Sequence, residues 1–115
     1  MVREGLQGFT YIPSQVFFVQ RKHIAELALK YRLPGVGDSL QLVEAGFLIA
    51  YGINYAAQYR RGADFVDKIL KGAKPGELPI EQPTVLDLAI NLQTAKTIGI
   101  KIPNSLLVQA TKVIE

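Results

Sequence analysis

The alternation of short apolar runs with amphipathic segments constrains this chain more than any other feature of its sequence. Residues 9–12 and 47–51 are rich in β-branched and aromatic side chains, and each run is followed by a turn and by apolar residues spaced three and four apart. The runs predict strands and the spacing predicts helices. Such alternation is typical of βαβ units with right-handed crossovers, so the sequence predicts an α/β fold with a mostly parallel sheet flanked by helices.

The expected elements follow from the positions of proline, glycine and capping residues. Strands are expected at 9–12, 34–37, 47–51 and 85–92, and helices at 15–31, 40–45, 55–71 and 93–98. A last amphipathic helix is expected to open at Pro103 and to carry Leu106, Leu107, Ala110 and Val113. The length of 115 residues suits one domain, so residues 1–115 are interpreted as a single α/β domain.

Residues 73–92 form a connection in which two prolines restrict the backbone. Pro79 and Pro83 bracket a short extended piece, after which the 85–92 strand re-enters the body of the domain. Because proline fixes the backbone angle φ, we interpret this segment as a stiff crossover connector followed by a strand.

Composition excludes several classes of protein. Apolar residues make up 49% of the chain and charged residues 20%, the balance of a folded globular protein. Cysteine is absent, which excludes disulfides, thiolate chemistry and cysteine-bound zinc. No apolar run approaches the roughly 20 residues of a membrane-spanning helix, and we expect no secretory signal at Met1–Gly5. The net charge of +3 is scattered among acids, which favours a solvated basic surface over a nucleic-acid partner.

The sequence offers few residues for catalysis. His23 is the only histidine and lies in a predicted helix beside Arg21 and Lys22, where an exposed structural role is favoured. Asp64 and Asp67 lie three apart on a helix face that also carries lysines, the pattern of a solvated face. We therefore expect no catalytic residues, no metal site and no cofactor, and a protein that is not an enzyme.

Residues 35–39 invite comparison with a phosphate loop. The stretch Gly-Val-Gly-Asp-Ser lacks the third glycine of a dinucleotide fingerprint and the Gly-Lys-Ser/Thr ending of a nucleotide-binding loop. A stand-alone flavodoxin-like domain that binds a nucleotide or phosphate at this loop is kept as an alternative. A truncated domain that only dimerises, without transport activity, is a second alternative.

Polar and aromatic residues gather where three predicted strands end. Ligands of open parallel sheets bind beyond the carboxyl ends of the strands. Each of these residues also has a structural interpretation, as an N-cap, a turn residue or a core side chain. Their convergence on one edge favours a small-molecule site. The candidate ligand-binding residues are Ser14, Gln15, Asp38, Ser39, Tyr51 and Asn54.

Several blocks of the sequence carry a family resemblance. They are FVDKILKGAKP at 65–75, LPIEQP at 78–83, AINLQTAKTIG at 89–99 and IPNSLL at 102–107, preceded by Phe17-Phe18, IAELA at 24–28, VEAG at 43–46 and Tyr51-Gly52. In this order they resemble the C-terminal part of substrate-binding proteins of ABC importers of the tryptophan/tyrosine-binding type. The resemblance begins near Phe9 and covers nearly the whole chain.

The resemblance implies a type I periplasmic-binding-protein fold, in which two α/β lobes joined by a hinge close on a small solute. This chain would be the C-terminal lobe, residues 73–92 would belong to the hinge, and the solute would be amino-acid-like. A transporter permease would be the partner of a full-length receptor, which would be periplasmic or anchored outside the cytoplasm. The surface that faces another lobe in such a protein is apolar, so we expect this chain to form a homodimer.

Overall fold

A computed structural model describes residues 5–115; residues 1–4, which contain most of the stretch inspected for a secretory signal, lie outside the described part. The chain divides into two compact units. The body comprises the residues up to Gly52 together with Asp87–Glu115, and the second unit, here called the α4 unit, is Ile53–Leu86. The single-domain interpretation and the hinge role of residues 73–92 stay predictions.

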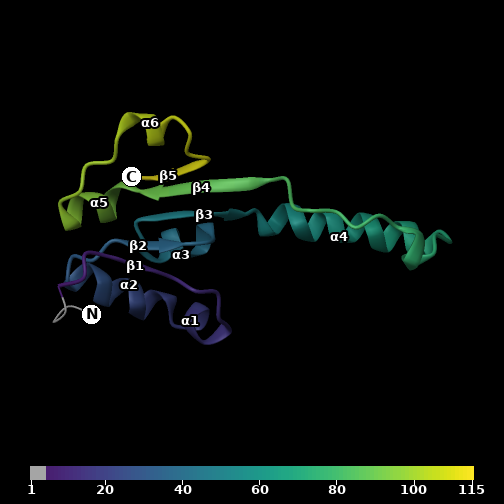
Figure 1. Cartoon of the computed structure of the whole chain (residues 1–115), viewed down its shortest axis with the longest axis horizontal. Helices are drawn as coiled ribbons and strands as arrows, with labels where there is room; N and C mark the ends of the chain where they lie inside the picture. Colours follow the sequence, from purple (N-terminus) through teal and green to yellow (C-terminus); the bar gives the residue numbers. More distant parts are fainter. Residues whose placement is uncertain (1–4) are drawn as a thin grey trace. The chain divides into compact units, whose positions relative to one another are not determined.

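The chain contains a five-stranded sheet whose strands lie in sequence order (Figure 1). The strands are β1 (Phe9–Thr10), β2 (Gly35–Gly37), β3 (Ile49–Ile53), β4 (Leu86–Asn91) and β5 (Lys112–Ile114). β1, β2 and β3 pair in parallel, and so do β4 and β5. β4 runs against β3, since Asn91 N–H donates to the Leu48 carbonyl while Asn54 N–H donates to that of Val85. One antiparallel step among parallel neighbours gives the mostly parallel α/β sheet that the sequence predicts.

Helix α3 is the packing centre of the body. Neighbouring residues of this short helix enter two core clusters: Leu42 packs with Ala25 and Phe47, and Val43 packs with strand residues including Ala50. All of these side chains are almost fully buried, and burial of apolar surface supplies the main stabilisation of the body. The helices of the body are α1 (Gln15–Val19), α2 (Arg21–Lys30), α3 (Leu40–Ala45), α5 (Leu92–Ile98) and α6 (Asn104–Leu107).

The two glycines of β2 leave room for core side chains. A Cβ on Gly35 would lie 2.6 Å from the ring of Phe9, and a Cβ on Gly37 would lie 2.6 Å from the side chain of Leu42. Contacts that short do not occur, so any larger residue would displace the core. Packing therefore explains a strand whose composition looks weak on propensity alone.

A buried polar network joins the end of β4 to the end of α3. The Asn91 side chain donates from Nδ2 to the Val43 carbonyl at 3.1 Å, and its Oδ1 accepts from Thr94 N–H at 3.0 Å. The Thr94 hydroxyl donates to the Gly46 carbonyl at 2.9 Å. Asn91 thus caps α5. Each hydrogen bond in this network satisfies a buried or partly buried polar group, which would destabilise the fold if it had no partner.

The C-terminal segment differs from the sequence prediction. The amphipathic helix expected through Val113 is wrong, because α6 ends at Leu107 and Lys112–Ile114 forms β5 beside β4. Thr111 makes the turn into this strand: its N–H donates to the Leu88 carbonyl and its Oγ1 accepts from Leu88 N–H. β-Branched residues at the open edge of β4 favour strand addition over continuation of a short helix.

Other boundaries differ in smaller ways. The helix expected over 15–31 is interrupted at Gln20 into α1 and α2. The third strand runs from Ile49 to Ile53 rather than over 47–51, although Phe47 and Leu48 are buried as the apolar run predicts. The fourth strand and the helix after it match the predicted ranges within a residue.

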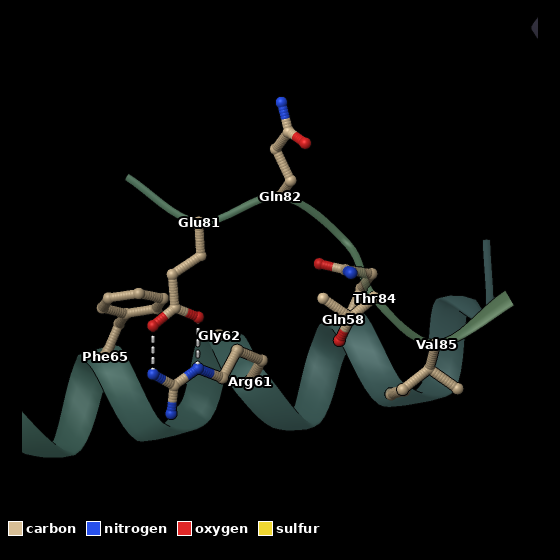
Figure 2. Close-up of a pocket in the computed structure, with 9 residues that line it drawn as sticks. Gln58, Arg61, Gly62, Phe65, Glu81, Gln82, Thr84 and Val85 are labelled. Carbon is tan, nitrogen blue, oxygen red and sulfur yellow. Dashed lines mark hydrogen bonds and ion pairs between the residues drawn. The ribbon is translucent and has the colours of Figure 1, made fainter. Parts of the chain in front are cut away.

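The α4 unit is one long helix with a returning segment. Helix α4 (Tyr55–Leu70) is capped by Asn54 and is followed by the 3₁₀ turn η2 (Pro75–Glu77). Residues 81–85 run back along the helix, where Glu81 faces Arg61 (Figure 2). None of the residues of α4 is buried. Across residues 5–115, no helix combines the length and apolar character that crossing a membrane requires.

Candidate functional site

The carboxyl ends of β1 and β2 lie beside the middle of β3 in the body. Tyr11 N–H, just past β1, donates to the Val36 carbonyl at 2.8 Å, and Gly37 at the end of β2 is in register with Ala50 of β3. The turn after β2 touches β3 itself, because a Cβ on Gly52 would lie 1.9 Å from the Asp38 carbonyl oxygen. The ends of β1 and β2 and residues 50–52 of β3 therefore form one continuous edge, called here the carboxyl edge.

Tyr11 organises the first turn of this edge. Its hydroxyl donates to the Ser14 carbonyl at 3.1 Å, and its ring packs edge-on against Phe17 and Phe47 at centroid distances of 6.5 and 6.2 Å. Ser14 is the N-cap of α1 but its side chain makes no capping hydrogen bond, and the next residue, Gln15, is exposed. The hydroxyl and amide groups of this turn are thus not used for helix capping. Sequence reasoning missed the role of Tyr11, which it placed only in a strand.

The second turn carries Asp38 and Ser39. Asp38 is half-buried, and Ser39 is only 4% exposed. Ser39 occupies the N-cap position of α3 without a capping bond, and its Oγ has no hydrogen-bond partner among the residues that the structure describes. A buried hydroxyl without a partner costs about 1–3 kcal/mol, so such groups usually have a reason outside packing.

Tyr51 was predicted at the end of the third strand, but it lies in the middle of β3, since the strand continues through Gly52 to Ile53. Its side chain is 63% exposed, which overturns its interpretation as a core residue. It points to the sheet face opposite Ala50, since alternate residues of a strand face opposite sides. Val36 lies on the same face and is also exposed. The edge thus combines an exposed aromatic side chain with the polar residues of two turns.

Asn54 has a structural role that the sequence also predicts. Its Oδ1 accepts from Ala57 N–H at 2.8 Å and caps α4. It belongs to the α4 unit, whereas the other five candidate residues belong to the body. The structure brings those five to the carboxyl edge, and a ligand contact for Asn54 stays a prediction.

The carboxyl edge carries groups that can bind a small molecule. A carboxylate, hydroxyl groups, an amide and a phenol can orient a small polar solute with an apolar part. His23 is exposed on α2 in the body. In the described range 5–115, no group of three or more His, Asp or Glu side chains could hold a metal ion.

The α4 unit contains a separate cavity of about 330 Å³. Its main polar groups are already paired, because Arg61 Nε donates to a carboxylate oxygen of Glu81 at 2.6 Å and a second guanidinium nitrogen donates to the other oxygen (Figure 2). Phe65 lies under the guanidinium, 5.0 Å from ring centroid to Cζ. The hydrogen bonds to Glu81 raise the pKa of Arg61 further, and those from Arg61 lower the pKa of Glu81.

The helical spacing that places Asp64 and Asp67 on a solvated face gives no sign of the pair between Arg61 and Glu81. The two residues are twenty apart, so no local spacing indicates the pair. The cavity is best explained as the space between α4 and residues 81–85, which the Arg61–Glu81 pair holds against the helix.

Comparison with solved structures finds proteins that share this architecture. A protein from Vibrio cholerae O1 biovar El Tor, described as a conserved domain protein, is 27% identical and superimposes with a TM-score of 0.87 over 97% of this chain. The structure of an ABC domain in complex with L-Trp from Streptococcus pneumoniae is 22% identical, with a TM-score of 0.88 over 98%. A ligand-free, open substrate-binding protein with adhesive properties from Clostridium difficile is 19% identical, with a TM-score of 0.64 over 92%.

The present chain spans 38%, 38% and 35% of the lengths of those three proteins. A search of curated proteins found no match. The family described as ABC transporter substrate binding protein matches this chain over residues 8–114, which is nearly its whole length. With the α/β architecture and the open carboxyl edge, this match shows that the chain belongs to the family of ABC transporter substrate-binding proteins.

Proposed function

We propose that this chain is the C-terminal lobe of a solute-binding component of an ABC importer, and that its carboxyl edge binds a small amino-acid-like solute. The observation that carries the proposal is that Asp38 and Ser39, just past the end of β2, lie beside the part of β3 that carries Tyr51. Open α/β sheets use this edge for ligands because the turns there present polar groups beyond the packed core. The family of the chain supports a solute-binding role.

The solute class follows from the side chains of the edge. The Asp38 carboxylate suits an ammonium group, since charge-assisted hydrogen bonds are stronger than neutral ones. The exposed Tyr51 ring suits an aromatic or apolar side chain by stacking. The Ser39 hydroxyl supplies a hydrogen-bonding group that the described protein residues leave unpaired. A similar solved domain holds L-Trp, which makes an aromatic amino acid the first solute to test.

The proposal also covers the other lobe, the partner and the compartment of the complete receptor. One edge encloses a small ligand on one side only, whereas ligand sites commonly bury 70–90% of the ligand surface. We therefore propose that another lobe completes the site, that a transporter permease is the partner of the complete receptor, and that it acts outside the cytoplasm. The lobe is proposed to bind without chemical turnover.

Phosphate binding at residues 35–39 is less well supported. Gly35 and Gly37 are required by the packing of Phe9 and Leu42, so the glycines need no phosphate to explain them. The ligand test below includes inorganic phosphate and a nucleotide as probes of this alternative.

Isothermal titration of the chain with L-Trp, L-Tyr, L-Leu, phosphate and ATP tests the proposal. We expect millimolar to high-micromolar binding of at least one amino acid, because half of the enclosure is missing. Tyr51→Ala and Asp38→Ala should each weaken this binding about tenfold or more, equivalent to about 1.4 kcal/mol.

Matched controls lie away from the carboxyl edge. Tyr31→Ala removes a half-exposed tyrosine at the end of α2, and Glu26→Ala removes an exposed carboxylate of the same helix. Both controls should retain the affinity of the parent chain. Binding that survives both edge substitutions unchanged would contradict the proposed site, and binding of phosphate or ATP alone would favour the nucleotide alternative.

A further inference from the structure

We propose that Thr94 is a positioning residue of the solute site and that it acts on Ser39 through helix α3. Thr94 lies on α5, the helix that follows β4, and its hydroxyl holds the C-terminal end of α3. Ser39 lies at the other end of the same helix. This inference rests on the proposed function, because it concerns the Ser39 hydroxyl that we assign to the solute.

The two ends of α3 are held differently. At the C-terminal end two side chains donate to backbone carbonyl oxygens, Asn91 to that of Val43 at 3.1 Å and Thr94 to that of Gly46 at 2.9 Å. At the N-terminal end no side chain within residues 5–115 caps the helix, and the buried Ser39 Oγ has no partner there. The helix is therefore fixed from its C-terminal end, which leaves the hydroxyl at its N-terminal end for a ligand.

The position of α3 depends on its tertiary contacts. The helix has six residues, and helices this short have little stability of their own in water. Leu42 and Val43 are fully buried in the core, and the two hydrogen bonds from Asn91 and Thr94 hold the end of the helix. Each of these bonds joins residues 48 apart in the sequence, so they fix α3 against a distant part of the body.

Packing connects α3 to the carboxyl edge. Gly37, the last residue of β2, lies so close to α3 that a Cβ there would be 2.6 Å from the side chain of Leu42. Asp38 and Ser39 follow directly in the chain. Because a packed core contains few voids, a displacement of Leu42 moves its neighbours with it. Loss of the hydrogen bond at Gly46 therefore changes the position of Ser39.

A second threonine of α5 shows the contrast with an ordinary helical role. Threonine in a helix can donate to the carbonyl four residues earlier, as Thr97 Oγ1 does to the Gln93 carbonyl at 2.9 Å. Thr94 is only 5% exposed and donates instead to a carbonyl outside its own helix. The Thr94 hydroxyl thus serves the contact between α3 and α5, whereas the Thr97 hydroxyl serves α5 alone.

Isothermal titration with L-Trp measures the effect on binding. An O–H···O hydrogen bond requires about 2.5–3.0 Å between its oxygens, so a small displacement of Ser39 lowers affinity. Thr94→Val keeps the size of the side chain but removes the hydroxyl, and it should weaken binding about three- to fivefold. Thr94→Ser retains the hydroxyl and should keep the affinity of the parent. Thr94→Ala also removes the hydroxyl and should match Thr94→Val, which keeps the test available if the valine variant does not fold.

A double-mutant cycle with Ser39→Ala tests whether Thr94 acts through Ser39. Thr94→Val should weaken L-Trp binding in the parent chain, but should cause no further loss in the Ser39→Ala background. Thr97→Val is the matched control on the same helix, and it should leave the affinity unchanged. Equal losses from Thr94→Val in both backgrounds would contradict the proposal, because Thr94 would then act on binding by another route.

Amide chemical shifts of the ¹⁵N-labelled chain without ligand test the positioning by itself. Thr94→Val should shift the amides of Asp38 and Ser39, whereas Thr94→Ser and Thr97→Val should not. If the parent binds no amino acid, the proposed function fails, and these shifts still decide whether Thr94 positions Ser39. Shifts confined to the residues around Gly46 and Thr94 would overturn the proposal, since the hydroxyl would then only stabilise the end of α3.

Discussion

The backbone carbonyl oxygen of Asp38 lies where a side chain on Gly52 would have to be, 1.9 Å from the position of its Cβ. This contact joins the turn after β2 to Gly52 within β3 and fixes the spacing between that turn and the strand. Only glycine permits it, because a methyl group at that distance overlaps the carbonyl. The close approach therefore sets the geometry of the carboxyl edge on which Ser39 and Tyr51 lie.

Gly52→Ala should destabilise the chain and disturb the edge together. The methyl group forces the Asp38 turn away from β3, and overpacking of this kind typically costs about 1–3 kcal/mol. Urea unfolding followed by circular dichroism measures the loss. Gly76→Ala is the matched control, since its Cβ would meet nothing within 4 Å, and it should be neutral within about 0.5 kcal/mol. Equal stability of the two variants would contradict the close contact.

Asn91→Ala should be among the most destabilising polar substitutions in the body. It leaves the Val43 carbonyl and the Thr94 N–H without their buried partner, a loss of about 2–4 kcal/mol for two hydrogen bonds. Thermal unfolding should show a lower midpoint. Asn104→Ala at the exposed start of α6 should change the midpoint little, and a similar shift for both would argue against the buried network.

Ser39→Ala should separate stability from binding. Its Oγ is buried without a partner, so replacement with alanine removes an unpaired polar group and should leave stability unchanged or raise it by about 1 kcal/mol. The same variant should bind the solute less tightly than the parent chain. Chemical unfolding and isothermal titration on one preparation measure both quantities. A clear loss of stability would show that the hydroxyl has a structural partner.

Acid should release residues 81–85 from α4. The hydrogen bonds from Arg61 hold the pKa of Glu81 below its ordinary value of 4.5, so the released state binds more protons than the fastened state. The contribution of the pair is therefore present at neutral pH and is lost as pH falls through the lowered pKa. The protection factor of the Asn54 amide, which is bonded to the Val85 carbonyl, should fall in the parent as the pH drops through the lowered pKa of Glu81.

Glu81→Gln is the matched control for that experiment. It keeps the shape of the side chain but removes the titrating group, so the protection factor of the Asn54 amide should be low at neutral pH and nearly independent of pH. An acid-induced loss of protection that persists in Glu81→Gln would assign the effect to another carboxyl group.

The fold could be predicted from sequence where hydrophobic spacing and capping agree. Asn54 and Gly46 bound their helices as predicted, because a side-chain cap and a glycine in a left-handed turn are local signals. The Lys112–Ile114 strand could not be predicted, since its stability comes from pairing with β4, twenty residues upstream. A helical spacing of Leu106, Leu107, Ala110 and Val113 was present, and tertiary pairing overrode it.

The candidate edge was predictable for a similar reason. Strand ends of parallel neighbours meet at one edge by topology, so Ser14 and Asp38 could be placed on one edge from the element order alone. Tyr51 was predicted at a strand end and instead lies within β3, beside the end of β2. Two other features could not be predicted, because they depend on atomic packing. They are the lack of a hydrogen-bond partner for the Ser39 hydroxyl and the contact between Asp38 and Gly52. Arg61 and Glu81 were missed because residues far apart in sequence leave no periodic signal.

The carboxyl edge is tested most directly by mapping the chemical shifts of ¹⁵N-labelled chain during titration with L-Trp. Binding at this edge predicts saturable shifts at the β1–α1 turn, at Asp38 and Ser39, and at Tyr51, while Arg61, Phe65 and Glu81 in the α4 unit stay unchanged. Shifts confined to those α4-unit residues, or none up to about 10 mM L-Trp and the other amino acids of the panel, would contradict the proposed solute-binding edge.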